Sequence, residues 1–120
     1  MVSFSFQTEF VPLIESGQKI QTIRSTRRCE KGQPMHLYTG LRTKQCKLIA
    51  VKKCAYTWQV IIEPRGVTLG DEPNLVILDR AHSDLFAVAD GFLNYPAMYN
   101  WFLERYKQEV FHGFLHRWVG

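Results

Sequence analysis

The sequence has 120 residues, of which 46% are hydrophobic and 22% are charged. This composition and length exclude a disordered chain and predict one globular domain, residues 1–120. No stretch approaches the length of a membrane span, and the first residues lack the charged and apolar regions of a signal peptide, so we expect a cytoplasmic protein with no membrane partner. The three cysteines show no Cys-x-x-Cys spacing, which argues against a disulfide framework and a zinc knuckle and favours reduced thiols.

The formal net charge of +4 is unevenly distributed along the chain. Ten basic residues and a single acidic one, Glu30, lie between Lys19 and Lys53, so the rest of the chain carries an excess of acid. Crowded positive charge is less costly when a polyanion supplies the counter-charge, which favours phosphate binding. The alternative is that strands spread these side chains around a barrel, where water solvates them.

The first half of the chain predicts short strands and one helix. Its apolar residues Phe10, Leu13 and Ile14 have helical spacing, with Thr8 as the cap and Gly17 as the stop. The predicted strands are Val2 to Phe6, Gln21 to Ser25, Met35 to Thr39, Lys47 to Val51 and Thr57 to Ile62.

The second half predicts a turn at Gly70 to Pro73, a buried run from Leu75 to Leu78, and then two helices and a strand. The first helix begins at the cap Ser83, ends at Gly91 and has the predicted apolar positions Leu85, Val88, Ala89 and Phe92. The second begins at Pro96 and is expected to bury Met98, Trp101, Phe102 and Tyr106. The final strand spans Val110 to Val119. Together these elements predict an α+β fold, a small mixed β-barrel with about three short helices.

Three polar residues follow the first helix, at the passage into the next strand. Thr22 and Arg24 share one strand face, and Lys19 joins them only if it still lies in the turn, which Gly17 permits. A threonine hydroxyl needs a neighbouring base to act as a nucleophile, and a buried lysine with a lowered pKa is such a base. The alternative is a solvated turn lysine beside an ordinary strand threonine.

The histidines near the end of the chain do not predict a metal site. In a strand, His112 and His116 are about 13 Å apart, too far to bind one metal ion directly. We therefore expect no metal and no cofactor.

The pattern Gly17-x-Lys19-x-x-Thr22-x-Arg24 resembles the signature of the ASCH domain, Gly-x-Lys-x-x-x-x-Arg after the first helix. The resemblance covers most of the chain, and the segment Tyr38 to Lys44 is similar to the form found in phage-associated members. Its other elements, in the expected order, are Phe6, the Gly32 turn before the strand Met35 to Tyr38, the segment Ala89 to Phe92 and the helix around Trp101 and Phe102. The ASCH domain is a relative of the PUA-like RNA-binding barrels, so the resemblance implies a PUA-like barrel in a bacterial or phage protein.

The activities of this family include RNA binding, a ribonuclease and bacterial amidohydrolases that remove the acetyl group from acetylated cytidine. The amidohydrolases use a lysine, a threonine and a glutamate, and the resemblance places Lys19, Thr22 and Asp90 at these positions. Aspartate is one methylene shorter than glutamate, so its reach to Lys19 or the substrate depends on the position of the helix end. Alternatively, Asp90 is a solvated residue beside the helix stop.

Several further residues are candidates for nucleic-acid binding. Tyr38 offers a face for stacking on a base, or is a barrel residue with a satisfied hydroxyl. The candidates for phosphate contacts at the mouth of the cleft are Arg24, Arg27, Arg28, Arg42 and Lys44. Three functions remain open: an amidohydrolase acting on an acylated cytidine, a ribonuclease using the same basic cleft, and an RNA-binding module without catalysis. The expected ligand is RNA or a modified nucleoside, and the oligomeric state is left open.

Overall fold

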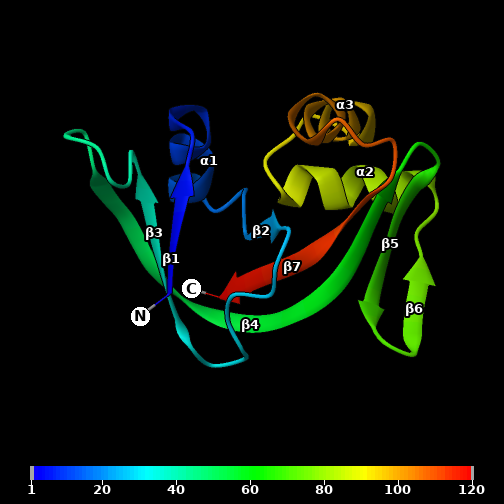
Figure 1. Cartoon of the computed structure of the whole chain (residues 1–120), viewed down its shortest axis with the longest axis horizontal. Coiled ribbons are helices and arrows are strands. Elements are labelled where there is room, and N and C mark those ends of the chain that lie inside the picture. Colours follow the sequence, from blue (N-terminus) through cyan, green and yellow to red (C-terminus); the bar gives the residue numbers. More distant parts are fainter. Residues whose placement is uncertain (1, 120) are drawn as a thin grey trace.

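The computed structural model describes residues 2–119 and has the predicted α+β class, with three α-helices in this part of the chain (Figure 1). The elements in chain order are β1 (Val2–Phe6), the 3-10 helix η1 (Thr8–Phe10), α1 (Val11–Ser16), β2 (Gln21–Arg24), β3 (Pro34–Thr39), β4 (Lys47–Glu63), β5 (Gly66–Asp71), β6 (Asn74–Ile77), α2 (Arg80–Ala89), α3 (Tyr95–Tyr106) and β7 (Phe111–Val119). None of the helices described has the length and hydropathy needed to cross a membrane.

All seven strands belong to one mixed sheet, which does not close into the predicted barrel. Its main order is β1-β3-β4-β5-β6, and β7 pairs with both β4 and β2. Within residues 2–119, β1 pairs only with β3 and β2 pairs only with β7, so both strands end the sheet as free edges. Figure 1 shows β4 as a long arc, with the three α-helices on the side toward which it curves. The helices therefore cover the concave side of an open sheet, where a barrel would be closed by further strand pairing.

The longest strand, β4, combines two strands that were predicted separately. Its first half pairs with β3 and its second half with β5 and β7. Register shifts between Leu37 and Tyr38 and between Cys54 and Tyr56 interrupt the regular ladder. Such irregularities bend a strand without ending it, so one strand can serve both halves of the curved sheet.

The hairpin of β5 and β6 corrects two predictions. The strand Gly66–Asp71 was missed, and the turn follows it at Glu72 and Pro73. Of the run expected to be buried, Leu75 to Ile77 are exposed, with Ile77 at 71%, and Leu78 alone in that run is half-buried. The reason is topological, since β6 lies at the edge of the sheet and apolar residues alone do not show which strand is central.

Helix α2 also differs from its prediction. It begins at Arg80, and its cap is Asp79, whose Oδ1 accepts from the His82 amide at 2.8 Å. Ser83 lies inside the helix and is buried. The predicted apolar residues Leu85 and Val88 are exposed, at 66% and 36%, because the face of α2 that packs on the core carries Phe86 and Ala87 instead.

Two apolar clusters form the core. The first packs α2 and α3 on the sheet and includes Val60, Ile62, Met98, Phe102 and Leu115. The second lies around β1, β3 and α1 and includes Phe4, Phe10, Met35, Leu37 and Trp118. Phe92 and Trp101 pack against both clusters, so they mark the seam between the two halves of the molecule.

Candidate ligand pocket

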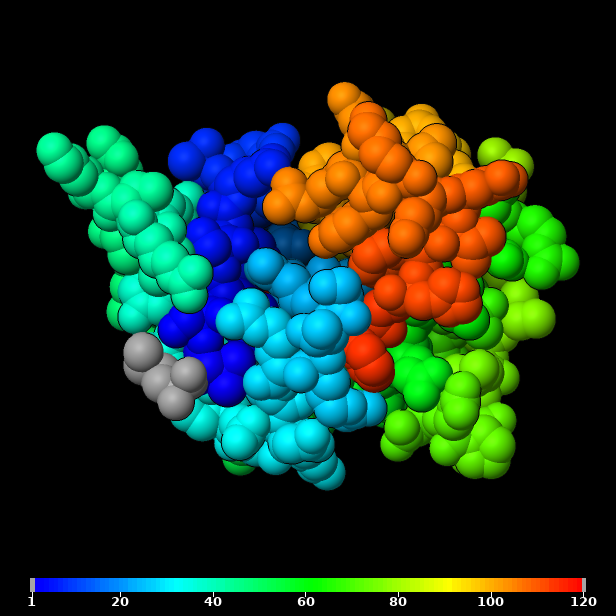
Figure 2. All heavy atoms as spheres, viewed as in Figure 1, coloured from blue at the N-terminus to red at the C-terminus, as the bar shows by residue number. Residues whose placement is uncertain are grey.

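A pocket opens at this seam. Its empty volume is about 470 Å³, a figure that includes open solvent at the mouth. Figure 2 shows the surface hollowed between the N-terminal segment in blue, the end of α3 in orange and the segment after β2 in light blue. The lining residues are Ser5, Phe6, Gln7, Phe10, Lys19, Thr22, Ile23, Arg24, Asp90, Phe92, Trp101, Arg105 and Tyr106.

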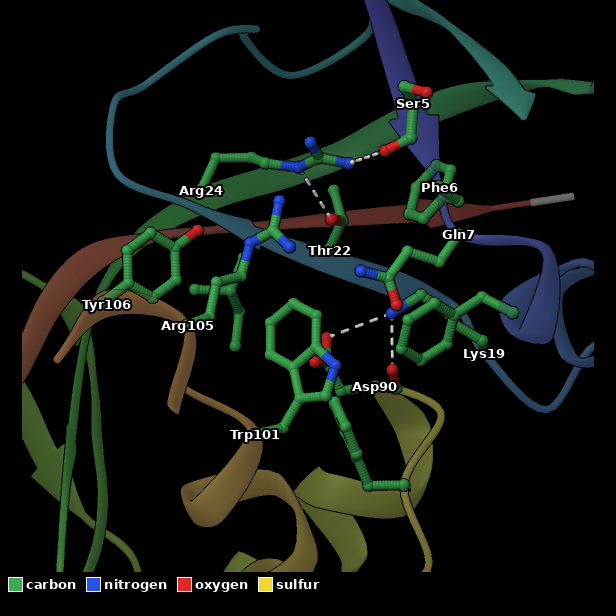
Figure 3. Close-up of a pocket in the computed structure, with 13 residues that line it drawn as sticks. Ser5, Phe6, Gln7, Lys19, Thr22, Arg24, Asp90, Trp101, Arg105 and Tyr106 are labelled. Atoms are coloured by element: carbon green, nitrogen blue, oxygen red, sulfur yellow. Dashed lines mark hydrogen bonds and ion pairs between the residues drawn. The ribbon is translucent and has the colours of Figure 1, made fainter. Parts of the chain in front are cut away.

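The three residues predicted to be catalytic line this one pocket. Lys19 comes from the turn between α1 and β2, Thr22 from β2, and Asp90 from the C-terminal end of α2 (Figure 3). Lys19 lies in the turn before β2, so it is not bound by strand alternation and can lie on the same side of the chain as Thr22. Residues far apart in the sequence thus converge on one small volume.

The turn that carries Lys19 is fastened at both ends. Gly17 ends α1 in the left-handed conformation with φ 86°, and the Lys19 amide returns to the Leu13 carbonyl at 2.9 Å. The next amide, that of Ile20, donates to the carbonyl of Ala89 at 2.9 Å. These two bonds hold the turn against the end of α2 and set Lys19 beside Asp90.

Lys19 and Asp90 form a buried pair. Lys19 Nζ donates to the main-chain oxygen of Asp90 and lies 3.6 Å from its carboxyl Oδ1. The two residues are only 4% and 3% exposed, so the readings of each as a solvated surface residue are wrong. The shorter aspartate side chain does reach Lys19, because the end of α2 is drawn into the pocket.

Burial shifts both groups of the pair toward their neutral forms. It lowers the pKa of Lys19, and the charge of Arg24 lowers it further, while Asp90 acts in the opposite direction. Burial raises the pKa of Asp90 against the influence of Lys19. A lowered pKa favours the neutral amine, the form that can accept a proton.

Thr22 is held by Arg24. The Arg24 Nε–H donates to Thr22 Oγ1 at 3.0 Å, and its Nη2 donates to the Ser5 carbonyl at 3.0 Å. Burial and then the charge of Arg28 lower the pKa of Arg24 to about 10, so it stays a cation at neutral pH. Because Thr22 Oγ1 accepts from Arg24, its own hydroxyl proton is left to donate elsewhere. No hydrogen bond joins Thr22 to Lys19 among residues 2–119.

Gln21 is a neighbour of the pair that the sequence analysis missed. Its Oε1 accepts from Arg117 Nε at 3.1 Å, and its amide favours the ionised Asp90 carboxyl. Within the described chain, Gln21 Nε2 and Asp90 Oδ1 nevertheless lack a hydrogen-bond partner of good geometry. Buried polar atoms without partners are uncommon, and of these two residues Asp90 is the one that lines the pocket.

Aromatic side chains form the apolar walls. The Trp101 ring lies 6.1 Å from that of Phe10 and 5.7 Å from that of Phe92, centroid to centroid. Arg105 lies over Trp101, with its guanidinium carbon 5.2 Å from the ring centroid. Helical spacing predicted that Trp101 and Tyr106 are buried core residues, but both are half-buried and line the pocket. Helical periodicity does not distinguish a pocket wall from a core.

The other predicted nucleic-acid-binding residues do not line this pocket. Arg27 donates to the Thr57 carbonyl at 3.1 Å, and Arg28 donates to the Ser3 carbonyl at 2.7 Å. These two arginines therefore fasten the segment after β2 to the sheet. Tyr38 lies in β3, and Arg42 and Lys44 lie in the connection from β3 to β4.

The histidines lie apart from any cluster of metal-binding side chains. His112 is exposed, whereas His116 is buried and accepts the Arg28 amide at Nε2, at 3.0 Å. Within residues 2–119 no group of three or more His, Cys, Asp or Glu side chains is placed to hold a metal ion.

Comparison with known proteins finds no matching family model, no matching curated protein and no matching solved structure.

Proposed function

We propose that the pocket binds an N4-acylated cytosine nucleoside and hydrolyses its amide, as the resemblance to ASCH-domain, PUA-like amidohydrolases implies. The observation that carries the proposal is the convergence of Lys19, Thr22 and Asp90 in one pocket with aromatic walls. The buried pair supplies a base, Thr22 supplies a nucleophile, and the walls suit a flat heterocycle.

The proposed reaction begins with attack by Thr22. A neutral Lys19 amine keeps its N–H groups for Asp90 and uses its lone pair to take the Thr22 proton, while Thr22 Oγ1 bonds to the acyl carbon. The Arg24 Nε–H, 3.0 Å from Oγ1, holds the Thr22 oxygen in position for the attack.

The amide bond then breaks. Lys19 returns its proton to the exocyclic nitrogen of cytosine, which leaves as the free amine, with Asp90 as the relay or the partner of the base edge. Water next attacks the Thr22 ester and gives its proton to Lys19, and the carboxylic acid leaves as Thr22 is restored. The net change is amide plus water to amine plus acid.

The aromatic walls suit a flat base. Stacking of a base on an aromatic side chain contributes about 1–3 kcal/mol, and Trp101 presents the largest ring lining the pocket. A stacked base would also keep bulk water from the Lys19 and Asp90 pair.

The test is the release of cytidine from N4-acetylcytidine by the purified protein, followed chromatographically. Thr22→Val keeps the shape of the side chain and removes the nucleophile, so turnover should fall by at least about a thousandfold. The matched control is Thr68→Val in β5, a strand threonine outside the pocket, which should retain wild-type turnover. No turnover by the wild-type protein at high concentration, or full turnover by Thr22→Val, contradicts the proposal.

The same variants separate the other functions. RNA cleavage that survives Thr22→Val and is lost in Lys19→Met would identify a ribonuclease. Binding of RNA by the wild-type protein with neither reaction would identify a binding module.

A further inference from the structure

Two arginines stand at the mouth of the pocket beside the proposed catalytic residues. Arg24 comes from β2 and Arg105 from the last turn of α3, and both line the pocket. Figure 3 shows their guanidinium groups directed to the side of the pocket where Thr22 lies. The proposed hydrolysis uses only the Nε–H of Arg24 and does not use Arg105.

Neither of these two cations forms an ion pair with an acidic side chain of residues 2–119. The ion pairs within residues 2–119 join Lys19 to Asp90, Arg27 to Glu30, Arg65 to Glu63 and His82 to Asp79. The positive charges of Arg28 and Arg105 both act on Arg24 and contribute to lowering its pKa. Tyr106 and Asp90 act on Arg24 in the opposite direction, but the Asp90 carboxyl is already paired with Lys19. A bound anion would therefore further stabilise the neighbouring arginines.

Arg105 is held in place by neutral contacts. Its guanidinium lies over the Trp101 ring at 5.2 Å. With the Gln7 amide turned so that its oxygen faces Arg105, that oxygen accepts from Arg105 Nη1 at 3.3 Å. Neither contact neutralises the charge, and the exposed guanidinium keeps donors for a ligand.

We propose that Arg105, together with Arg24, binds a phosphate group attached to the nucleoside, so that the pocket takes a cytidine nucleotide in preference to the free nucleoside. The inference rests on the proposed function for the identity of the base. It adds the substrate class, a phosphorylated nucleoside, and a residue that determines specificity. A guanidinium provides parallel N–H donors that match a phosphate better than a lysine does.

A purely structural role for Arg105 makes a different prediction. A cation in the last turn of a helix is favoured by the helix dipole, and this one also covers Trp101. In that case Arg105 would affect stability and would not distinguish a nucleotide from a nucleoside.

The experiment measures the ratio of two affinities. Calorimetric titration at low ionic strength with cytidine and with cytidine 5′-monophosphate gives the ratio for the wild-type protein, for Arg105→Gln and for Arg105→Lys. The ratio is insensitive to partial unfolding, because both ligands meet the same folded fraction. The control is Arg80→Gln, an exposed arginine on α2 outside this pocket. Cytidine 3′-monophosphate and a cytidine-containing trinucleotide distinguish a terminal phosphate from one within an RNA chain.

The wild-type protein and Arg80→Gln should prefer the nucleotide by about 10-fold to 100-fold, from charge-assisted hydrogen bonds. Arg105→Gln should lower the ratio several-fold and leave only the part of the preference that Arg24 supplies, and Arg105→Lys should give an intermediate value. An effect seen only with the trinucleotide supports the inference and assigns the phosphate to RNA. Equal affinities for all phosphorylated and unphosphorylated ligands, or a ratio unchanged in Arg105→Gln, overturns it. These measurements need no turnover, so they are separate from the failure or success of the hydrolysis assay.

Discussion

At the scale of single residues, the buried pair of Lys19 and Asp90 dominates the site. Both side chains are buried, and each counteracts the pKa shift that burial imposes on the other. Removing one member of such a pair leaves the other buried without its partner, which is more costly than losing both together. The pair should therefore be energetically coupled.

A double-mutant cycle tests this coupling. Lys19→Met should lower the free energy of unfolding by about 3–5 kcal/mol, because it leaves the Asp90 carboxyl and carbonyl unsatisfied. Adding Asp90→Asn should cost less in the Lys19→Met background than in the wild-type protein, with a coupling of about 1–3 kcal/mol. Urea unfolding of the four proteins supplies the values. Additive effects would mean that the two groups do not stabilise each other.

At the scale of elements, β7 positions β2, the strand that carries Thr22 and Arg24 of the pocket. It pairs with both β2 and β4, and its His116 lies opposite Thr22 in the register. Gly113 of β7 allows β2 to approach closely, since a Cβ there would lie 2.6 Å from the Arg24 carbonyl oxygen. His116 then secures the segment after β2 by accepting the Arg28 amide.

The buried histidine predicts a dependence of stability on pH. Burial lowers the pKa of His116 from 6.5 to about 4, and protonation would remove the lone pair that accepts the Arg28 amide. Between these values the unfolded chain binds a proton that the folded chain does not, so stability should fall as the pH decreases. The loss attributable to His116 is on the order of 3 kcal/mol.

Urea unfolding from pH 7 to pH 4 measures this loss. His116→Gln keeps a hydrogen-bond acceptor without the titration, so its stability should fall less steeply with decreasing pH than that of the wild-type protein. The exposed His112→Gln should follow the wild-type curve. Parallel curves for the wild-type protein and His116→Gln would contradict the assignment.

At the scale of the whole molecule, the basic stretch is divided among three places. Lys19 and Arg24 face the pocket, while Arg27 and Arg28 bind main-chain carbonyls. The exposed members include Lys44, Lys47 and Lys53, on or near the β3–β4 arm that projects at one end of the molecule (Figure 1). These lysines line no part of the pocket and are exposed, so they are available to contact an RNA backbone.

The arm makes a prediction about salt dependence. The double variant Lys44→Gln and Lys47→Gln should weaken RNA binding uniformly across sequences and reduce the slope of log affinity against log salt by about one per lysine that contacts phosphate. Arg80→Gln again serves as the control. Fluorescence titration over a range of salt concentrations gives the slopes, and an unchanged slope would show that these lysines are only a solvated surface.

Local patterns in the sequence predicted several elements well, because they depend on neighbouring residues. Alternation identified β1 and β7, and glycine correctly marked the end of α1. The spacing of Lys19, Thr22 and Arg24 also identified the turn and strand that reach the pocket. Turn geometry and strand period are encoded within a few residues, so no long-range contact is needed to recognise them.

Tertiary packing decided what local patterns could not. Whether the sheet closes, whether β6 is central or at an edge, and which face of α2 is buried all depend on partners distant in the sequence. The same holds for the site. Gln21 is positioned beside the pair by its contact with β7, and Arg105 is positioned at the mouth by contacts with Trp101 and the N-terminal segment. The sequence by itself determined the chemical groups and the local turn that presents Lys19. The burial that draws Asp90 to it, and lowers the pKa of the amine, exists only once α2 has packed against the turn.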